Sequence, residues 1–196
     1  FSFDGGVDTL QLPAGLEELA SLRWSTCVTE ALGAPGLTLK RLTLTNHVVD
    51  EALLVALAAH APHLEHLVLT TCRVTQPLLR ELLQWRWPQL TWLDLSNSTL
   101  KEDGAMLATL KAPKLEVLDL TNTRLKDPEV QALLASPLLE HLREVSLRAN
   151  RITRAAVAPV LARSHHLRLL NLKKTLVTPG DLVGLASALP GTRLSR

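Results

Sequence analysis

The sequence predicts an α/β fold in which short strands form one parallel sheet and helices return the chain from each strand to the next. A pattern of eleven residues with leucine or another aliphatic residue at positions 1, 4, 6 and 11 recurs along the chain. The segments between its copies carry apolar residues at helical spacing. Leucine provides 46 of the 196 residues, a bias that indicates one structural unit used repeatedly.

Six copies of this pattern are regular, and each predicts one strand. Successive copies begin 25 to 27 residues apart. Alternation around positions 4 and 6 points these side chains to the core and positions 3 and 5 to solvent. The regular copies begin at Leu39, Leu64, Leu90, Leu115, Leu142 and Leu167.

The two ends of the chain are less regular. Residues 7–38 predict two irregular units: an edge strand in VDTLQL from Val7 and an earlier copy that begins at Leu19. At the other end, TRLSR stands where a further copy would begin. The chain starts without Met and stops inside this unit, so we expect it to be part of a longer chain.

Five intervening segments predict helices. The first, Asp50–Pro62, has an acidic first turn, which suits the positive end of a helix dipole. Pro62, Pro88 and Pro113 each stand two residues before the next copy, where proline ends a helix. The remaining predicted helices lie within residues 78–88, 103–113, 127–137 and 178–190.

The consensus LxxLxLxxNxL resembles that of leucine-rich repeat proteins over nearly the whole chain. The copy lengths, and Cys or Thr in place of the consensus asparagine, are most similar to the cysteine-containing and ribonuclease-inhibitor-like classes. LREVSLRANRI is also similar to long bacterial leucine-rich proteins. The resemblance implies one domain over residues 1–196, a right-handed solenoid with a concave parallel sheet and convex helices.

Position 9 of each copy predicts a side chain that hydrogen-bonds loop backbone at a buried turn. Cys27 and Cys72, two copies apart, would be about 9–10 Å from each other at sheet spacing, too far for a disulfide. Reduced thiols fit a reducing compartment, and we expect a cytoplasmic protein. The position-9 residues are Cys27, His47, Cys72, Ser98, Thr123, Asn150 and Thr175.

No motif in the sequence predicts catalysis. Phosphate-binding loops, the zinc-protease motif and the hydrolase nucleophile motif are absent from the sequence. His60, His63 and His66 are spaced by three, but Pro62 interrupts the helix that would align them. We therefore expect no enzyme, no metal or other cofactor and no small-molecule substrate. No apolar run reaches the roughly 18–20 residues that span a bilayer, so we expect no membrane insertion.

Trp92 marks the candidate binding surface because it occupies an outward position in the middle of the predicted sheet. It has His66, Val68 and Val117 as outward neighbours. A buried tryptophan is a favoured interface anchor; the alternatives are that another segment covers it or that it leans on neighbouring side chains. Asp94 and Asp119 occupy one slot on adjacent strands, about 5 Å apart. They would serve acid–base or cation chemistry or, alternatively, only make the surface polar.

The C-terminal part is basic, with a formal charge of +8 from His141 onward against −6 before it. Its basic side chains are predicted to cluster, with Arg148, Lys173 and Lys174 flanking the Trp92 surface and attracting an acidic protein. Alternatives are a solvated face without a partner and polyanion binding; nucleic acid is disfavoured because the cluster lacks aromatic stacking partners. The predicted cluster is Arg143, Arg148, Arg151, Arg168, Lys173 and Lys174.

Together these features predict a non-catalytic protein–protein interaction module. Its contact surface would comprise His66, Val68, Trp92, Asp94, Val117, Asp119, Arg148, Lys173 and Lys174. A second hypothesis makes the chain the targeting or regulatory part of a larger enzyme or signalling protein. A third is polyanion binding through the basic C-terminal copies.

Overall fold

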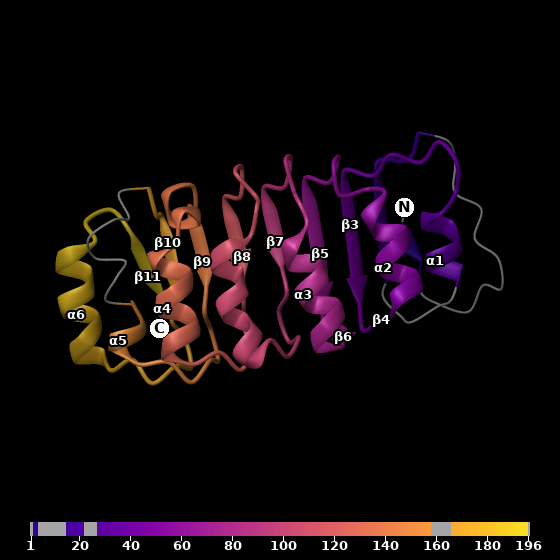
Figure 1. Cartoon of the computed structure of the whole chain (residues 1–196). Helices are drawn as coiled ribbons and strands as arrows, with labels where there is room; N and C mark the ends of the chain where they lie inside the picture. Colours follow the sequence, from indigo (N-terminus) through magenta and orange to yellow (C-terminus); the bar gives the residue numbers. More distant parts are fainter. Residues whose placement is uncertain (1, 4–14, 22–26, 158–165, 196) are drawn as a thin grey trace.

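The computed structural model describes residues 2–3, 15–21, 27–157 and 166–195 and shows an α/β protein with one large parallel sheet. Nine strands form this sheet in the order of the chain, β1-β2-β3-β5-β7-β8-β9-β10-β11. Helices lie along one face of it, so the chain advances from one end of the sheet to the other (Figure 1). The strand side chains that point away from these helices lie on the opposite face of the sheet.

The strands of the large sheet are short and all parallel. They are β1 (Ser2–Phe3), β2 (Glu18–Ser21), β3 (Arg41–Thr45), β5 (His66–Thr70), β7 (Trp92–Asp94), β8 (Val117–Asp119), β9 (Glu144–Ser146), β10 (Leu169–Asn171) and β11 (Arg193–Ser195). A second sheet pairs β4 (Val48–Val49) with β6 (Arg73–Val74). The α-helices are α1 (Cys27–Leu32), α2 (Glu51–Ala58), α3 (Gln76–Gln84), α4 (Asp127–Ala135), α5 (Arg154–Val157) and α6 (Pro179–Ala188), and the 3₁₀ helices are η1 (Lys101–Thr109) and η2 (Pro137–Glu140).

The periodic leucines point into the core, as the pattern predicts. Equivalent residues of neighbouring copies are direct register partners: Leu67 pairs with Leu93 and Leu93 with Leu118. All three are at most 1% exposed. Full burial of such a side chain contributes about 1.5–3 kcal/mol, and no single copy can provide that burial without its neighbours.

The earlier copy does not begin at Leu19, contrary to the prediction. Leu19 pairs with Leu42 and therefore occupies position 4, so the copy begins at Leu16. Ser21 consequently lies opposite Leu44 at inward position 6, fully buried, instead of facing solvent. Its hydroxyl lies 3.0 Å from Nε2 of His47, a buried contact that satisfies both polar groups.

The predictions for the two ends of the chain have different outcomes. VDTLQL, predicted as an edge strand, lies outside the described residues; the described edge strand is β1, which pairs with β2. TRLSR is confirmed as the start of a further strand, because β11 pairs in parallel with β10.

Four of the five predicted helices are α-helical, and the fifth is not. In α2, Asp50 caps the first turn, its carboxylate accepting the Leu53 N–H at 2.8 Å. The segment predicted at 103–113 instead forms η1, which packs closely against α4. A Cβ on Gly104 would lie 2.1 Å from Leu125 Cδ2, so any other residue here would force the buried Leu125 side chain to move.

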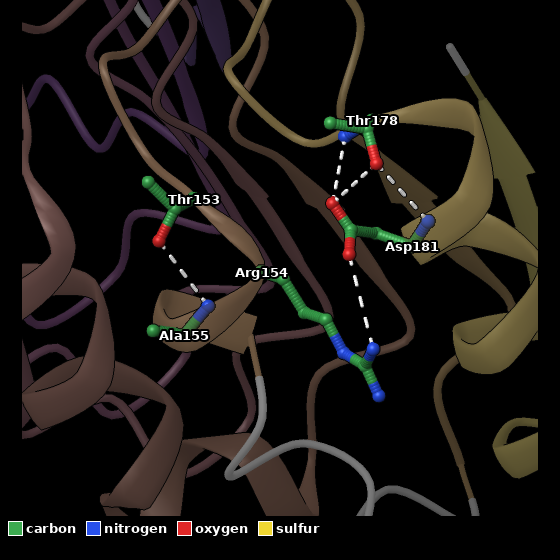
Figure 2. Close-up of polar contacts among 5 residues, drawn as sticks. All are labelled: Thr153, Arg154, Ala155, Thr178 and Asp181. Carbon is green, nitrogen blue, oxygen red and sulfur yellow. Dashed lines mark hydrogen bonds and ion pairs between the residues drawn. The ribbon is translucent and has the colours of Figure 1, made fainter.

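Helix α6 begins with a reciprocal cap (Figure 2). The Thr178 hydroxyl and N–H both donate to Asp181 Oδ2, and the Asp181 N–H donates back to the Thr178 hydroxyl. Arg154 of α5 lies 3.8 Å from the other carboxylate oxygen and so links the two helices. These hydrogen bonds, foremost the Thr178 hydroxyl, lower the pKa of Asp181.

Side chains at position 9 join neighbouring copies through the loop backbone. Cys72 Sγ donates to the Leu44 carbonyl at 3.4 Å, and Ser98 Oγ donates to the equivalent Leu69 carbonyl at 3.0 Å. Asn150 goes further: its Nδ2 donates to Leu120 O at 2.7 Å while its Oδ1 accepts from backbone N–H groups. The predicted backbone role of position 9 is confirmed for these residues.

Position 8 is left-handed in every regular copy. Asparagine tolerates this conformation and fills the position three times, at φ of 54° to 61°. Thr71, Ala149 and Lys174 hold the same backbone at 57° to 59°. The turn therefore holds the left-handed backbone conformation even where the residue is less suited to it than asparagine.

Candidate functional site

Trp92 lies on the sheet face opposite the helices and stacks on His66. The two residues are register partners on β5 and β7, and their rings are 5.9 Å apart between centroids and 4° from parallel. Trp92 remains 36% exposed, whereas the next residue, Leu93, is 1% exposed. Strand alternation thus places the indole outward and the leucine inward.

The stacked pair favours a neutral imidazole. Burial lowers the pKa of His66, and the neighbouring Arg41 guanidinium lowers it further. Arg41 is the register partner of His66 on β3 and leans toward Glu18, with Nη1 3.6 Å from a carboxylate oxygen. The pair therefore presents a flat, uncharged aromatic surface at neutral pH.

Two half-buried valines extend this apolar surface. Val117 is the register partner of Trp92 on β8, and Val68 lies two residues after His66 on the same face of β5. We call His66, Val68, Trp92 and Val117 the Trp92 patch. The structure brings together all four residues, as predicted.

Asp94 and Asp119 are register partners, as predicted, but each carboxylate already has a structural role. Asp94 Oδ1 accepts the Ser96 N–H at 2.7 Å, and Asp119 Oδ1 accepts the Thr121 N–H at 2.8 Å. These bonds stabilise the turn that follows each strand. The pair thus makes the border of the Trp92 patch polar, and its geometry is that of turn-capping groups.

The predicted basic cluster is divided between two edges of the sheet. Arg148 and Lys173 occupy one slot just after β9 and β10, where the Ala149 N–H donates to the Lys173 carbonyl at 2.8 Å. Arg143 and Arg168 lie at the opposite edge, just before the same strands. The prediction of a single cluster is wrong because the length of each strand separates positions 2 and 7.

The first of these edges carries the basic residues predicted for the contact surface. Lys173 and Lys174 are exposed, and Arg148 is half-buried. The adjacent Asn171 carboxamide accepts the Lys173 N–H at 3.1 Å, which fixes the turn on which both lysines stand. Arg148 follows the second strand from Asp94 and Lys173 the third, about 10 and 15 Å away at sheet spacing.

The described histidines and Cys72 are not grouped as metal ligands. His60 is buried and its Nε2 lies 2.9 Å from the Leu32 carbonyl, whereas His63 is exposed. Within the described ranges, no group of three or more metal-binding side chains occurs. Cys72 is a free buried thiol whose pKa is raised by burial to about 11; the side chain of Cys27 lies outside what the structure describes.

A hollow that the repeat pattern does not predict opens at the edge where β8, β9 and β10 begin. It has a volume of about 630 Å³, and Arg143 and Arg168 are among the residues that line it.

No helix among the described residues is long and apolar enough to cross a membrane. The chain matches no protein-family model and no curated protein. Its function is therefore inferred from these surfaces.

Proposed function

We propose that the chain is a leucine-rich repeat domain, closest to the cysteine-containing and ribonuclease-inhibitor-like classes, that binds a protein partner without catalysing a reaction. Its strands would follow a right-handed solenoid with the sheet concave and the helices convex. Parallel strands in chain order and helices confined to one face support this reading. One such domain would cover the whole chain and act in the cytoplasm.

The observation that carries the proposal is the exposed, stacked Trp92. A large aromatic side chain on a regular strand, held by His66, is already ordered before a partner arrives. Binding then costs little side-chain entropy, which favours affinity. Tryptophan is also among the residues that contribute most to interfaces when a partner buries them.

The charges around the Trp92 patch indicate which partner would fit. Arg148, Lys173 and Lys174 would attract an acidic surface and increase the association rate, while Asp94 and Asp119 border the apolar centre. A protein with an apolar anchor for Trp92 and an acidic flank about 10–15 Å away meets both requirements.

The experiment starts from partners co-purified with the full chain from its native host and measures their affinity directly. We expect Trp92→Ala to weaken binding about tenfold or more. Reversal of Arg148, Lys173 and Lys174 to Glu should mainly slow association, with a smaller salt dependence than in the wild type. Unchanged binding in both variants would remove the proposal.

Matched controls lie outside the proposed contact surface. Val55 of α2 is 69% exposed, so Val55→Ala removes an exposed apolar side chain away from the sheet face. Reversal of Arg73, Arg86 and Lys111, which are all exposed, makes the same change in net charge. Both controls should leave the affinity within about twofold of the wild type.

Polyanion binding is the second candidate, favoured by the three basic residues on one edge. Retention on heparin that falls steeply with salt and disappears in the Arg148/Lys173/Lys174 reversal, but persists in Trp92→Ala, would favour it. A protein partner that depends on Trp92 distinguishes the first candidate from the second.

A further inference from the structure

The hollow at the edge where β8, β9 and β10 begin is bounded mainly by polar side chains. It holds about 630 Å³, within the range of small-molecule pockets. Its walls include position 2 of four copies and the residue that precedes three of them. The charged and titratable groups used below are Lys114, Glu116, His141, Arg143, His166 and Arg168.

Cations along this edge are paired with the preceding copy. Lys40 Nζ lies 2.6 Å from Glu17, and Arg143 Nε lies 3.4 Å from Glu116. Lys114 Nζ likewise donates to Gln89 at 2.6 Å. Each of these three cations is thus neutralised or hydrogen-bonded by a residue of the preceding copy.

Arg168 breaks this pattern. The same slot in the preceding copy holds Arg143, whose carbonyl accepts the Arg168 N–H at 2.7 Å. The following copy offers Thr192, whose hydroxyl already donates to the Leu167 carbonyl at 2.7 Å. Among the described residues, the Arg168 guanidinium has no ion pair or hydrogen bond.

Two arginines therefore start from neighbouring strands about 4.8 Å apart and border one cavity. Like charges at this spacing repel each other unless an anion lies between them. His141 and His166, both exposed, stand beside them in the lining and offer further ring N–H donors. The lining acids are Glu116, which faces Arg143, and Glu140, which also has a partner; with Lys114 the cavity remains net positive.

We propose that this hollow binds an anionic small molecule whose phosphate or carboxylate group lies between Arg143 and Arg168. The planar guanidinium fork matches both groups in bidentate geometry. The rest of the volume would hold the body of the ligand against Pro113 and Pro190. This site is separate from the Trp92 patch, so it goes beyond the protein-binding function.

Titration calorimetry of the full chain at low ionic strength tests the site with two probes, inorganic phosphate and citrate. We expect at least one probe to bind, and Arg168→Gln to weaken it about tenfold or more. Glu116→Gln, which removes an acid and frees Arg143, should strengthen binding several-fold. The probe that binds more tightly identifies the head group.

Arg73→Gln is the matched control because it removes the same charge from an exposed arginine of β6 that does not line the hollow. It should change the affinity less than about twofold, and thermal unfolding should show that each variant is folded. Lack of binding by both probes at millimolar concentration overturns the proposal. Equal weakening by Arg168→Gln and Arg73→Gln overturns it too, since that result means attraction by net charge alone.

Discussion

The indole of Trp92 lies nearly parallel to the imidazole of His66, with 5.9 Å between the ring centroids. A stacked aromatic pair of this kind contributes about 0.5–1.5 kcal/mol beyond the burial of its area. A double-mutant cycle with His66→Ala and Trp92→Ala, measured by urea unfolding, should give a coupling free energy in that range. His63→Ala with Trp92→Ala is the non-contacting control. A coupling near zero for the stacked pair would contradict its role in ordering the indole.

Asn150→Ala should be strongly destabilising. Its carboxamide satisfies the backbone of two copies at once, donating to Leu120 O and accepting from the N–H of Leu125 at 3.0 Å. Each buried group left without a partner costs about 1–3 kcal/mol, so we expect a loss of about 3 kcal/mol or more in the free energy of unfolding. Thr175→Ala removes a half-buried hydroxyl that donates to Leu172 O and accepts the Val177 N–H at 3.3 Å, and it should cost less, about 1 kcal/mol. Equal losses in the two variants would refute this interpretation.

Thr71→Asn should stabilise the protein. Thr71 is exposed and β-branched and holds φ of 59°, whereas asparagine fills the equivalent position at Asn46, Asn97 and Asn122. Relief of the left-handed penalty should raise the free energy of unfolding by about 1 kcal/mol. Thr45→Asn, one position earlier in its copy, is the control because Thr45 has no positive φ. A similar gain from both changes would show that the backbone conformation is not the cause.

Acid should destabilise the fold partly through His47. Burial lowers the pKa of this imidazole in the folded state, while its contact with Ser21 acts in the opposite direction. Since the unfolded chain then takes up the proton more readily, the free energy of unfolding falls as the pH drops from about 6.5 through the lower folded pKa. His66, whose pKa is also lowered, contributes with the same sign.

The check on this prediction is the melting temperature between about pH 7 and pH 5. The decrease over that interval should be smaller in His47→Asn than in the wild type, whatever the stability of the variant at neutral pH. His63→Asn, at an exposed position, should retain the wild-type decrease. A decrease in His47→Asn as large as that of the wild type would exclude His47 as its source.

The regular copies could be predicted from sequence because their inward positions are nearly all leucine. Leu16 and Leu19 are spaced like positions 1 and 4, and so are Leu19 and Leu22, so the first copy had two possible registers. The inward Ser21 made the correct register less apolar. Only the fold reveals that His47 supplies the polar contact that Ser21 needs.

The candidate sites, too, could be predicted from sequence only in part. Strand alternation placed Trp92 and its neighbours on one face correctly, because two-residue periodicity determines side-chain direction. Helical spacing predicted a helix at 103–113 but not its 3₁₀ geometry, and the close approach of Gly104 to Leu125 is a tertiary contact that this spacing does not encode. The hollow beside Arg168 is lined by residues of several neighbouring copies, so a list of basic residues did not reveal it.

Because the order of the strands in the large sheet is the order of the chain, each strand finds its partners within one or two neighbouring units. Assembly can therefore nucleate in the most regular central copies and spread outward in both directions, at low cost in loop entropy. A destabilising change in one unit would then uncouple the segments on either side of it, and each segment would unfold at its own temperature.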